Sequence, residues 1–187
     1  METRAHLLTA AERAVRARGF DAVSYADLAL EVGIRKASIH YHFPKKADLA
    51  EALIADYVAR LAQERRKLAA HATGGAVIAG LIALYREALD DGRQLCLCVA
   101  FAAGRDSLDD RVRGHLARFH EDSVAWLRDA FRRAREDGSI RRVSGPADEA
   151  RAALALLEGA QIMARAAQDV TIYDAATKAL RKRIWEG

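Results

Sequence analysis

The sequence has few of the residues that interrupt helices or cross-link chains. Its 187 residues include two prolines and two cysteines, and aromatic residues make up 6%. Scarce proline with abundant alanine, leucine and arginine favours helices, and no segment has a convincing strand pattern. Cys96 and Cys98 lie two positions apart, so a helix would point them to nearly opposite faces and would not allow a disulfide. These features predict an all-α fold without structural disulfides.

A long hydrophobic run is also missing. The longest apolar stretch, Gly74 to Tyr85, is shorter than the roughly 20 residues that span a bilayer. Met1 to His6 lead into a charged amphipathic helix and lack the apolar core of a secretory signal. We therefore expect a cytoplasmic protein with no membrane partner. The net charge is only +4, so the location of the charge is more informative than its sum.

The hydrophobic periodicity predicts about nine helices, and glycine, proline and capping residues predict their ends. Ser24 and Asp27 form a capping box at the start of the second helix. Thr73-Gly74-Gly75 is expected to interrupt the helical pattern after the fourth helix. The expected helices cover Thr3 to Arg18, Tyr25 to Val32, Arg35 to His42, Lys46 to Ala70, Ala76 to Leu89, Leu95 to Ala103, Leu108 to Glu136, Ala147 to Ala167 and Tyr173 to Trp185.

Positive charge is concentrated in one short segment. No acidic residue lies between Glu31 and Asp48, a stretch that holds Arg35, Lys36, Lys45 and Lys46. Unopposed charge of this kind attracts a phosphate backbone. The segment follows a helix and a glycine turn at Gly33, which is the arrangement of a helix-turn-helix. The alternative is a solvated charged helix face, which is the common meaning of such a cluster.

The first fifty or so residues resemble the DNA-binding domain of the TetR/AcrR family of bacterial regulators. The resemblance rests on the order and spacing of Ala10-Ala11, Gly19-Phe20, Ser24-Tyr25-Ala26-Asp27-Leu28-Ala29, Val32-Gly33-Ile34, Ile39-His40-Tyr41-His42-Phe43 and Lys45-Lys46-Ala47-Asp48-Leu49. It implies a three-helix DNA-binding domain over residues 1–46 and a helical ligand-binding and dimerisation domain over residues 47–187.

The predicted DNA contacts combine residue chemistry with this resemblance. Arg35 and Lys36 can reach guanine acceptors or phosphates, and Ser38 can donate to either. The family often has tyrosine where this chain has His40, which changes reach and protonation. The resemblance assigns phosphate contacts to Tyr41, His42, Lys46 and the backbone amides near Ser24 and Tyr25. His40 and His42 could suggest a metal site, but they are two apart without a nearby thiol or carboxylate, so none is predicted.

The downstream part resembles the branches of the family that include NemR-like and LmrA/YxaF-like regulators. By resemblance, an effector binds in a cavity within these helices. Aromatic walls with a few polar groups suit a small organic ligand. The candidates, any of which can instead be plain core, are Tyr57, Leu61, Tyr85, Cys98, Phe101, His115, Phe119, Trp126 and Gln161.

The resemblance also implies dimerisation through the last two long helices. The helix from about Ala147 to Ala167 carries small and apolar residues that let two helices approach closely. Symmetry favours a dimer, because two recognition helices read the two halves of a palindrome. The alternative is packing of the same face inside one chain. The predicted dimer residues are Ala153, Leu156, Leu157, Gly159, Ala160 and Met163.

Together with the residues above, the resemblance implies a homodimeric transcriptional repressor that a small-molecule effector releases from a palindromic operator. No cofactor, metal or catalytic motif is indicated. One alternative is a regulator that senses oxidants or electrophiles through Cys96 or Cys98. Another is a thiol-dependent enzyme, for which the sequence offers no positioned base. A third is a helical ligand-binding or scaffold protein that has lost DNA binding.

Overall fold

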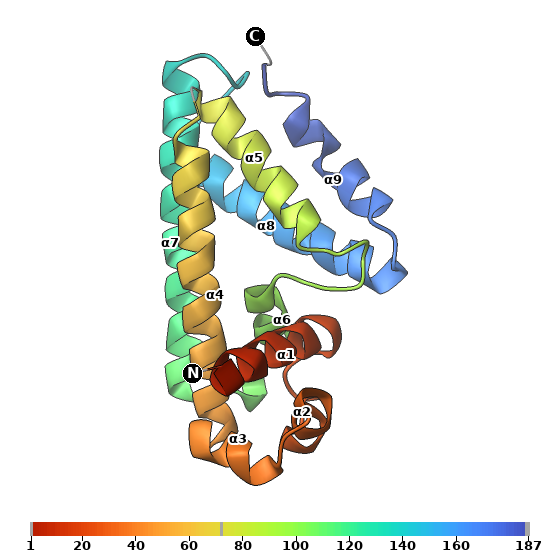
Figure 1. Ribbon diagram of the computed structural model, residues 1–187. Helices are drawn as coiled ribbons and strands as arrows, with labels where there is room; N and C mark the ends of the chain where they lie inside the picture. Colours follow the sequence, from red (N-terminus) through yellow and green to blue (C-terminus); the bar gives the residue numbers. More distant parts are fainter. Residues whose placement is uncertain (1, 72, 186–187) are drawn as a thin grey trace. The chain divides into compact units, whose positions relative to one another are not determined.

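The computed structural model describes residues 2–71 and 73–185, with only the backbone described at Glu2 and Arg105. Within these ranges the chain forms nine α-helices and one short 3-10 helix, and no strand beyond an isolated bridge (Figure 1). The all-α prediction is confirmed. The elements are α1 (Glu2–Arg18), α2 (Tyr25–Val32), α3 (Lys36–His42), α4 (Lys46–Ala69), α5 (Gly74–Glu87), α6 (Leu97–Ala103), η1 (Arg105–Ser107), α7 (Asp110–Glu136), α8 (Pro146–Ala167) and α9 (Thr171–Arg181).

The start of α5 differs from the sequence prediction. Gly74 and Gly75 do not break the helix but form its first turn, where the Thr73 side chain accepts a hydrogen bond from the Ala76 amide. A Cβ atom on Gly74 would lie only 2.3 Å from the backbone nitrogen of Ala134 in α7. Glycine is therefore required for the close approach of two backbones, a requirement that does not depend on local helix propensity.

The end of α9 also differs, because the helix stops at Arg181 and does not reach Trp185. The following residues run antiparallel to the segment after α7. Ile140 and Ile184 form the isolated bridge, and the Trp185 amide donates to the Ser139 carbonyl at 2.8 Å. Pairing with another segment thus replaces the last helical turn.

The chain divides into two compact units by its contacts. Unit 1 comprises residues 1–59 and 97–118, and unit 2 comprises residues 60–96 and 119–187. The predicted DNA-binding domain, residues 1–46, lies wholly within unit 1. In this unit α1 packs against α2 and α6, and α2 packs against α3. Its buried apolar side chains come from every helix and include Leu7, Leu28, Ile39, Leu49 and Phe101.

Unit 2 is built mainly on α5, α8 and α9, with α8 lying along α9 and α5 contacting both (Figure 1). Its core joins apolar residues of α5, α7, α8 and α9, among them Leu81, Phe131, Leu157 and Tyr173. The unit also buries polar side chains, namely Ser123, Ser139, Gln161 and Thr177. Among the described residues, no helix is long and apolar enough to cross a membrane.

Candidate functional site

One serine and one glycine, Ser24 and Gly33, set the two ends of α2 in the helix-turn-helix. The Ser24 hydroxyl oxygen accepts from the Asp27 amide at 3.1 Å and donates to the Asp27 carboxylate at 2.8 Å, which fixes the start of α2. Gly33 ends that helix in the left-handed conformation, with φ of 73°, and its amide donates to the Ala29 carbonyl. A residue with a side chain would be strained there, so the predicted turn at Gly33 is confirmed.

Helix α3 buries one face and exposes its polar face. Ile39 and Phe43 are buried in unit 1, at 0% and 2% exposure, as expected for the residues that hold the helix in place. Residues three and four positions apart share a helix face, so Ile39 and Phe43 anchor one side and the remaining side chains project to solvent. Tyr41 is 84% exposed. The exposed set is Arg35, Lys36, Ala37, His40 and Tyr41, while Ser38 and His42 are half-buried.

Tyr25 has a structural role that the sequence did not reveal. Its side chain is buried, and its hydroxyl donates to the backbone carbonyls of Phe43 and Lys45, each at 2.9 Å. Burial and the nearby Asp48 carboxylate raise the pKa of Tyr25 to about 12, so the hydroxyl keeps its proton. The side chain braces the turn between α3 and α4 and is not exposed as a DNA contact. Its ring also meets the edge of the His40 ring at 4.9 Å.

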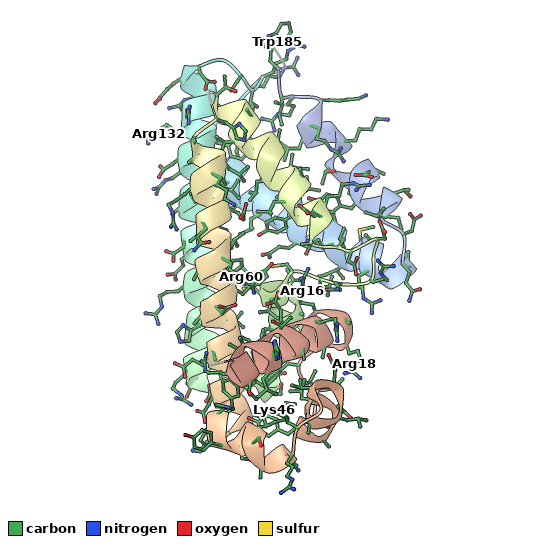
Figure 2. The ribbon with its side chains drawn as sticks, in the orientation of Figure 1. Arg16, Arg18, Lys46, Arg60, Arg132 and Trp185 are labelled. Carbon is green, nitrogen blue, oxygen red and sulfur yellow. The ribbon has the colours of Figure 1, made fainter. Side chains whose placement is uncertain are left out.

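Lys46 is engaged inside unit 1. Figure 2 shows it at the start of α4, where its ammonium lies 3.4 Å from the Asp21 carbonyl and 4.5 Å from the centre of the Phe20 ring. The predicted phosphate contact by Lys46 would have to compete with these contacts. The Lys45 amide donates to the Asp48 carboxylate at 2.9 Å, which caps α4 and draws that carboxylate to the backbone.

The predicted ligand residues are divided between the two units. Tyr57, Cys98, Phe101 and His115 belong to unit 1. Cys98 and Phe101 are fully buried, and the Phe101 ring lies 4.9 Å from the Phe20 ring. His115 is half-buried, with Nε2 3.3 Å from a carboxylate oxygen of Glu51. These contacts make Phe101 part of the packing of α6 onto the end of α1.

Gln161 is a hydrogen-bonded residue of the unit 2 core. It has no exposed surface. Its amide nitrogen donates to the Tyr85 carbonyl at 2.6 Å, and its amide oxygen accepts from the Cys96 backbone amide at 3.0 Å. The Tyr173 hydroxyl makes a similar link to the Ile82 carbonyl at 2.8 Å. The buried polar side chains thus tie α5 to α8 and α9.

Arg65 is a residue of unit 2 that sequence reasoning missed. Its Nη2 donates to the Ser123 hydroxyl at 2.6 Å, and its guanidinium lies over the rings of Phe119 and Trp126, at 5.7 and 5.5 Å from their centres. Its Nε is buried without a hydrogen-bond acceptor among the described residues, which costs about 1–3 kcal/mol. The signal was present, since Arg65 interrupts the apolar stripe of α4 between Leu61 and Leu68.

Trp126 contacts Arg65 and also borders an open groove. It lines a groove of about 440 Å³ with the apolar residues Ala69, Val77 and Ala130 and with charged residues of α7. The remaining unit 2 candidates, Leu61, Tyr85 and Phe119, are buried.

The predicted dimer residues do not share one face of α8. Ala153, Leu157 and Ala160 are buried in the core of their own chain, which is the intramolecular alternative, so they are not available to a partner. Met163 is 60% exposed, and Leu156 and Gly159 are half-buried. A Cβ atom on Gly159 would meet nothing within 4 Å. The exposed face, which we call the α8 outer face, consists of Ala152, Ala155, Leu156, Gly159, Ile162, Met163 and Ala166.

The two thiols are buried. Cys96 is 2% exposed and Cys98 has no exposed surface, and neither is in a disulfide. Reactive cysteines are accessible and lie in electropositive surroundings, so burial does not favour redox sensing. No group of three metal-binding side chains occurs among the described residues.

Comparisons with known proteins agree along most of the chain. Residues 7–53 match the family model for bacterial regulatory proteins of the tetR family, and residues 74–180 match that of the tetracyclin repressor-like C-terminal domain. The regulator TtgR of Pseudomonas putida is 43% identical over 53 residues, which cover 28% of this chain and 25% of TtgR. ArpR of the same species, a probable regulator, is 37% identical over 73 residues, covering 36% and 35%. The matched part thus spans about a third or less of each relative.

Solved structures match over nearly the full length. A TetR-family transcriptional regulator from Agrobacterium tumefaciens has a TM-score of 0.91 and 26% identity, covering 98% of this chain and 97% of that one. The reduced form of NemR from Escherichia coli has a TM-score of 0.80 and 23% identity, with the same coverage. The NemR match shows a shared fold.

Proposed function

We propose that this chain, which belongs to the tetR family of bacterial regulatory proteins, is a DNA-binding repressor of transcription and not an enzyme. The observation that carries the proposal is the polar face of α3, where Arg35, Lys36, His40 and Tyr41 are exposed on a helix whose opposite side is buried. An exposed cationic helix of a helix-turn-helix fits the major groove. Its place of action would be the cytoplasm.

The α3 residues have separable tasks in this proposal. Arg35 and Lys36 read guanine acceptors or neutralise phosphates, and Ser38 donates to a base edge or a phosphate. Tyr41 and His42 contact phosphates, as do the backbone amides near Ser24 and Tyr25. Phosphate contacts release counterions, so the affinity falls steeply as the salt concentration rises.

A homodimer completes the proposed binding unit. The α8 outer face is apolar and made of small side chains, and the adjoining α9 exposes Ala175 and Ala179. A second copy of the same face can pack there because Gly159 leaves room for a close helix approach. A twofold dimer presents two α3 helices to the halves of a palindromic operator.

Release by a small organic effector follows from linkage. An effector that binds one arrangement of the dimer more tightly than another shifts the population by its ratio of affinities. Unit 2 supplies aromatic and buried polar side chains for such a ligand. The thiols of Cys96 and Cys98 are buried, which does not support oxidant sensing or thiol catalysis as the alternative.

The test compares two double variants with the same loss of charge. Arg35→Ala with Lys36→Ala removes two cations at the start of α3, whereas Arg128→Ala with Arg132→Ala removes two exposed cations from α7. Arg132 projects outward from that helix in Figure 2. Since each specific contact contributes about 1–3 kcal/mol, we expect the α3 variant to lose roughly 100-fold or more in affinity for the operator. The α7 variant should stay within about threefold. Equal losses would mean that only net charge matters, and unchanged binding by the α3 variant would refute the assignment.

A further inference from the structure

Arg65 is a cation held among aromatic rings in unit 2. Phe119 and Trp126 lie against its guanidinium, at 5.7 and 5.5 Å from the ring centres. A ring face attracts the positive charge of a guanidinium, but it does not accept hydrogen bonds from the N–H groups, which lie in the guanidinium plane. Those donors must therefore find acceptors at the edge of the group.

The edge of the Arg65 guanidinium is only partly satisfied. Arginine has five N–H donors. Among the described residues, Nη2 donates to the Ser123 hydroxyl, and Nε is buried without an acceptor. The Ser123 hydroxyl itself donates to the Phe119 carbonyl at 2.6 Å, so its orientation is fixed.

Arg65 also lacks a counter-ion. None of the ion pairs among the described residues brings a carboxylate within 4.0 Å of it. The half-buried carboxylate of Glu158 lies 3.4 Å from Nε2 of His120, and Glu64 pairs with Lys67 at 2.7 Å. These two carboxylates, of α8 and α4, thus have a histidine and a lysine as neighbours, and Glu158 Oε1 makes no hydrogen bond among the described residues.

We propose that Arg65 binds the carboxylate of an aromatic carboxylic acid, and that such monoanions are the effector class of this regulator. A carboxylate matches the planar fork of a guanidinium and accepts two parallel N–H bonds. One uncompensated cation balances a monoanion, whereas a phosphate dianion would require a second cation. Trp126 contacts the guanidinium and also lines the groove, and the apolar part of that groove suits a flat hydrophobic body.

The inference rests on the proposed function but can fail separately from it. The test measures ligand binding by calorimetry in the absence of DNA. The probes are three acids, benzoate, 2-naphthoate and indole-3-acetate, each paired with its primary amide. Acid and amide share shape but differ in charge and in hydrogen-bonding groups, so their affinity ratio reports recognition of the carboxylate.

Arg65→Gln is compared with Arg66→Gln, a matched control that removes the same charge from the next, exposed position of α4. We expect at least one acid to bind 10-fold or more tightly than its amide to the unaltered protein and to the Arg66 variant. In Arg65→Gln this ratio should fall to about one. Arg65→Lys keeps the charge without the fork, so an intermediate ratio is expected, and it serves as the test if Arg65→Gln does not fold.

Two results would overturn the inference: the absence of acid preference in all three pairs, and a preference retained in Arg65→Gln. A retained preference together with a lowered melting temperature would make Arg65 only a structural tie between α4 and α7. Operator binding by Arg65→Gln without ligand should equal that of the unaltered protein. Intact operator binding with no acid preference would reject the effector class and leave the repressor proposal standing.

Discussion

The two units differ in where their polar side chains lie: unit 2 buries several of them, whereas unit 1 exposes those of α3. Among the described residues, the buried serine, threonine and glutamine side chains all lie in unit 2, where Gln161 and Ser123 bond to backbone and side chains of other helices. In unit 1 the polar side chains of α3 are exposed over an apolar interior. A rigid apolar base that presents groups outward suits recognition of a large surface such as DNA. Internal polar groups suit recognition of a small molecule that enters the protein.

The largest expected effect is on stability, and it comes from replacing a glycine in each unit. In unit 2, Gly74→Ala places a methyl group against the backbone of Ala134 and Ala130, which cannot move aside as a side chain can. We expect a loss of about 3 kcal/mol in the free energy of unfolding. In unit 1, Gly114 lies in α7 with nothing within 4 Å, so Gly114→Ala should raise stability by about 0.5–1 kcal/mol. Urea titration measures both, and a mild effect of Gly74→Ala would contradict the close packing of α5 on α7.

Exposed apolar residues provide the second comparison. Ile162 of unit 2 is 51% exposed on the α8 outer face, and Leu30 of unit 1 is 85% exposed on α2. Ile162→Asp would bury two charges at a twofold interface, so we expect the dimer dissociation constant to rise roughly 100-fold, or about 3 kcal/mol. Leu30→Asp should leave it unchanged. Analytical ultracentrifugation over a dilution series decides, and an intact dimer in both variants would place the interface elsewhere.

The recognition helix could be predicted from sequence for a physical reason. Helix α3 is short, and Pro44 follows it closely. The apolar pair Ile39 and Phe43 therefore decides which face is buried, and the opposite face must be exposed. Helix α8 has no such contrast, because small and apolar residues occur on both sides of it. Three of its six predicted dimer residues, Ala153, Leu157 and Ala160, consequently face the core, while exposed Ile162 was not predicted.

Residues defined by tertiary contacts were the ones that sequence reasoning missed. The tight contact at Gly74 depends on α7, sixty residues away in sequence. Arg65 is one charge among many on α4, and its lack of a counter-ion is visible only once α7 is in place. The hydroxyl of Tyr25 likewise depends on carbonyls at Phe43 and Lys45. Local periodicity carries no information about such pairings.

A smaller effect is expected from the buried hydroxyl of unit 1. Tyr25→Phe removes the donor to two carbonyls and should reduce stability by about 1–2 kcal/mol. Operator affinity should fall only modestly, because α3 loses a brace and not a DNA contact, and the salt dependence of binding should stay the same. A reduced salt slope would instead mean that Tyr25 takes part in phosphate binding. Thermal unfolding and binding at three salt concentrations separate these results.

The smallest expected effect concerns an ion pair at the edge of unit 2. Asp174 accepts from Arg86 at 2.8 and 2.9 Å and from Arg181 at 2.8 Å, and these guanidinium groups lower its pKa to about 2. Because the folded pKa is depressed, the stabilisation is present above about pH 4 and is lost as the pH falls toward 2. The side chain is 32% exposed, so solvent screening limits the contribution to about 1 kcal/mol.

Asp174→Asn should therefore lower stability by about 1 kcal/mol at pH 7, and this difference should disappear as the pH falls through about 2. Asp129→Asn is the control, since Asp129 is 55% exposed with arginines at 3.5 Å, and its effect should stay below about 0.5 kcal/mol. Unfolding by urea across this pH range is the measurement. A constant difference at all pH values would show that the hydrogen-bond geometry, and not the charge, stabilises the link between α5 and α9.

The central claim is that two α3 helices of a dimer read one operator. The most direct measurement is footprinting of the purified protein on the DNA upstream of its own gene, at several salt concentrations with scrambled competitor DNA. We expect competitor-resistant, salt-sensitive protection of two half-sites related by twofold symmetry and centred about 10 base pairs, or a multiple of that, apart. Protection that the scrambled competitor removes equally well, or a single unpaired site, would contradict it.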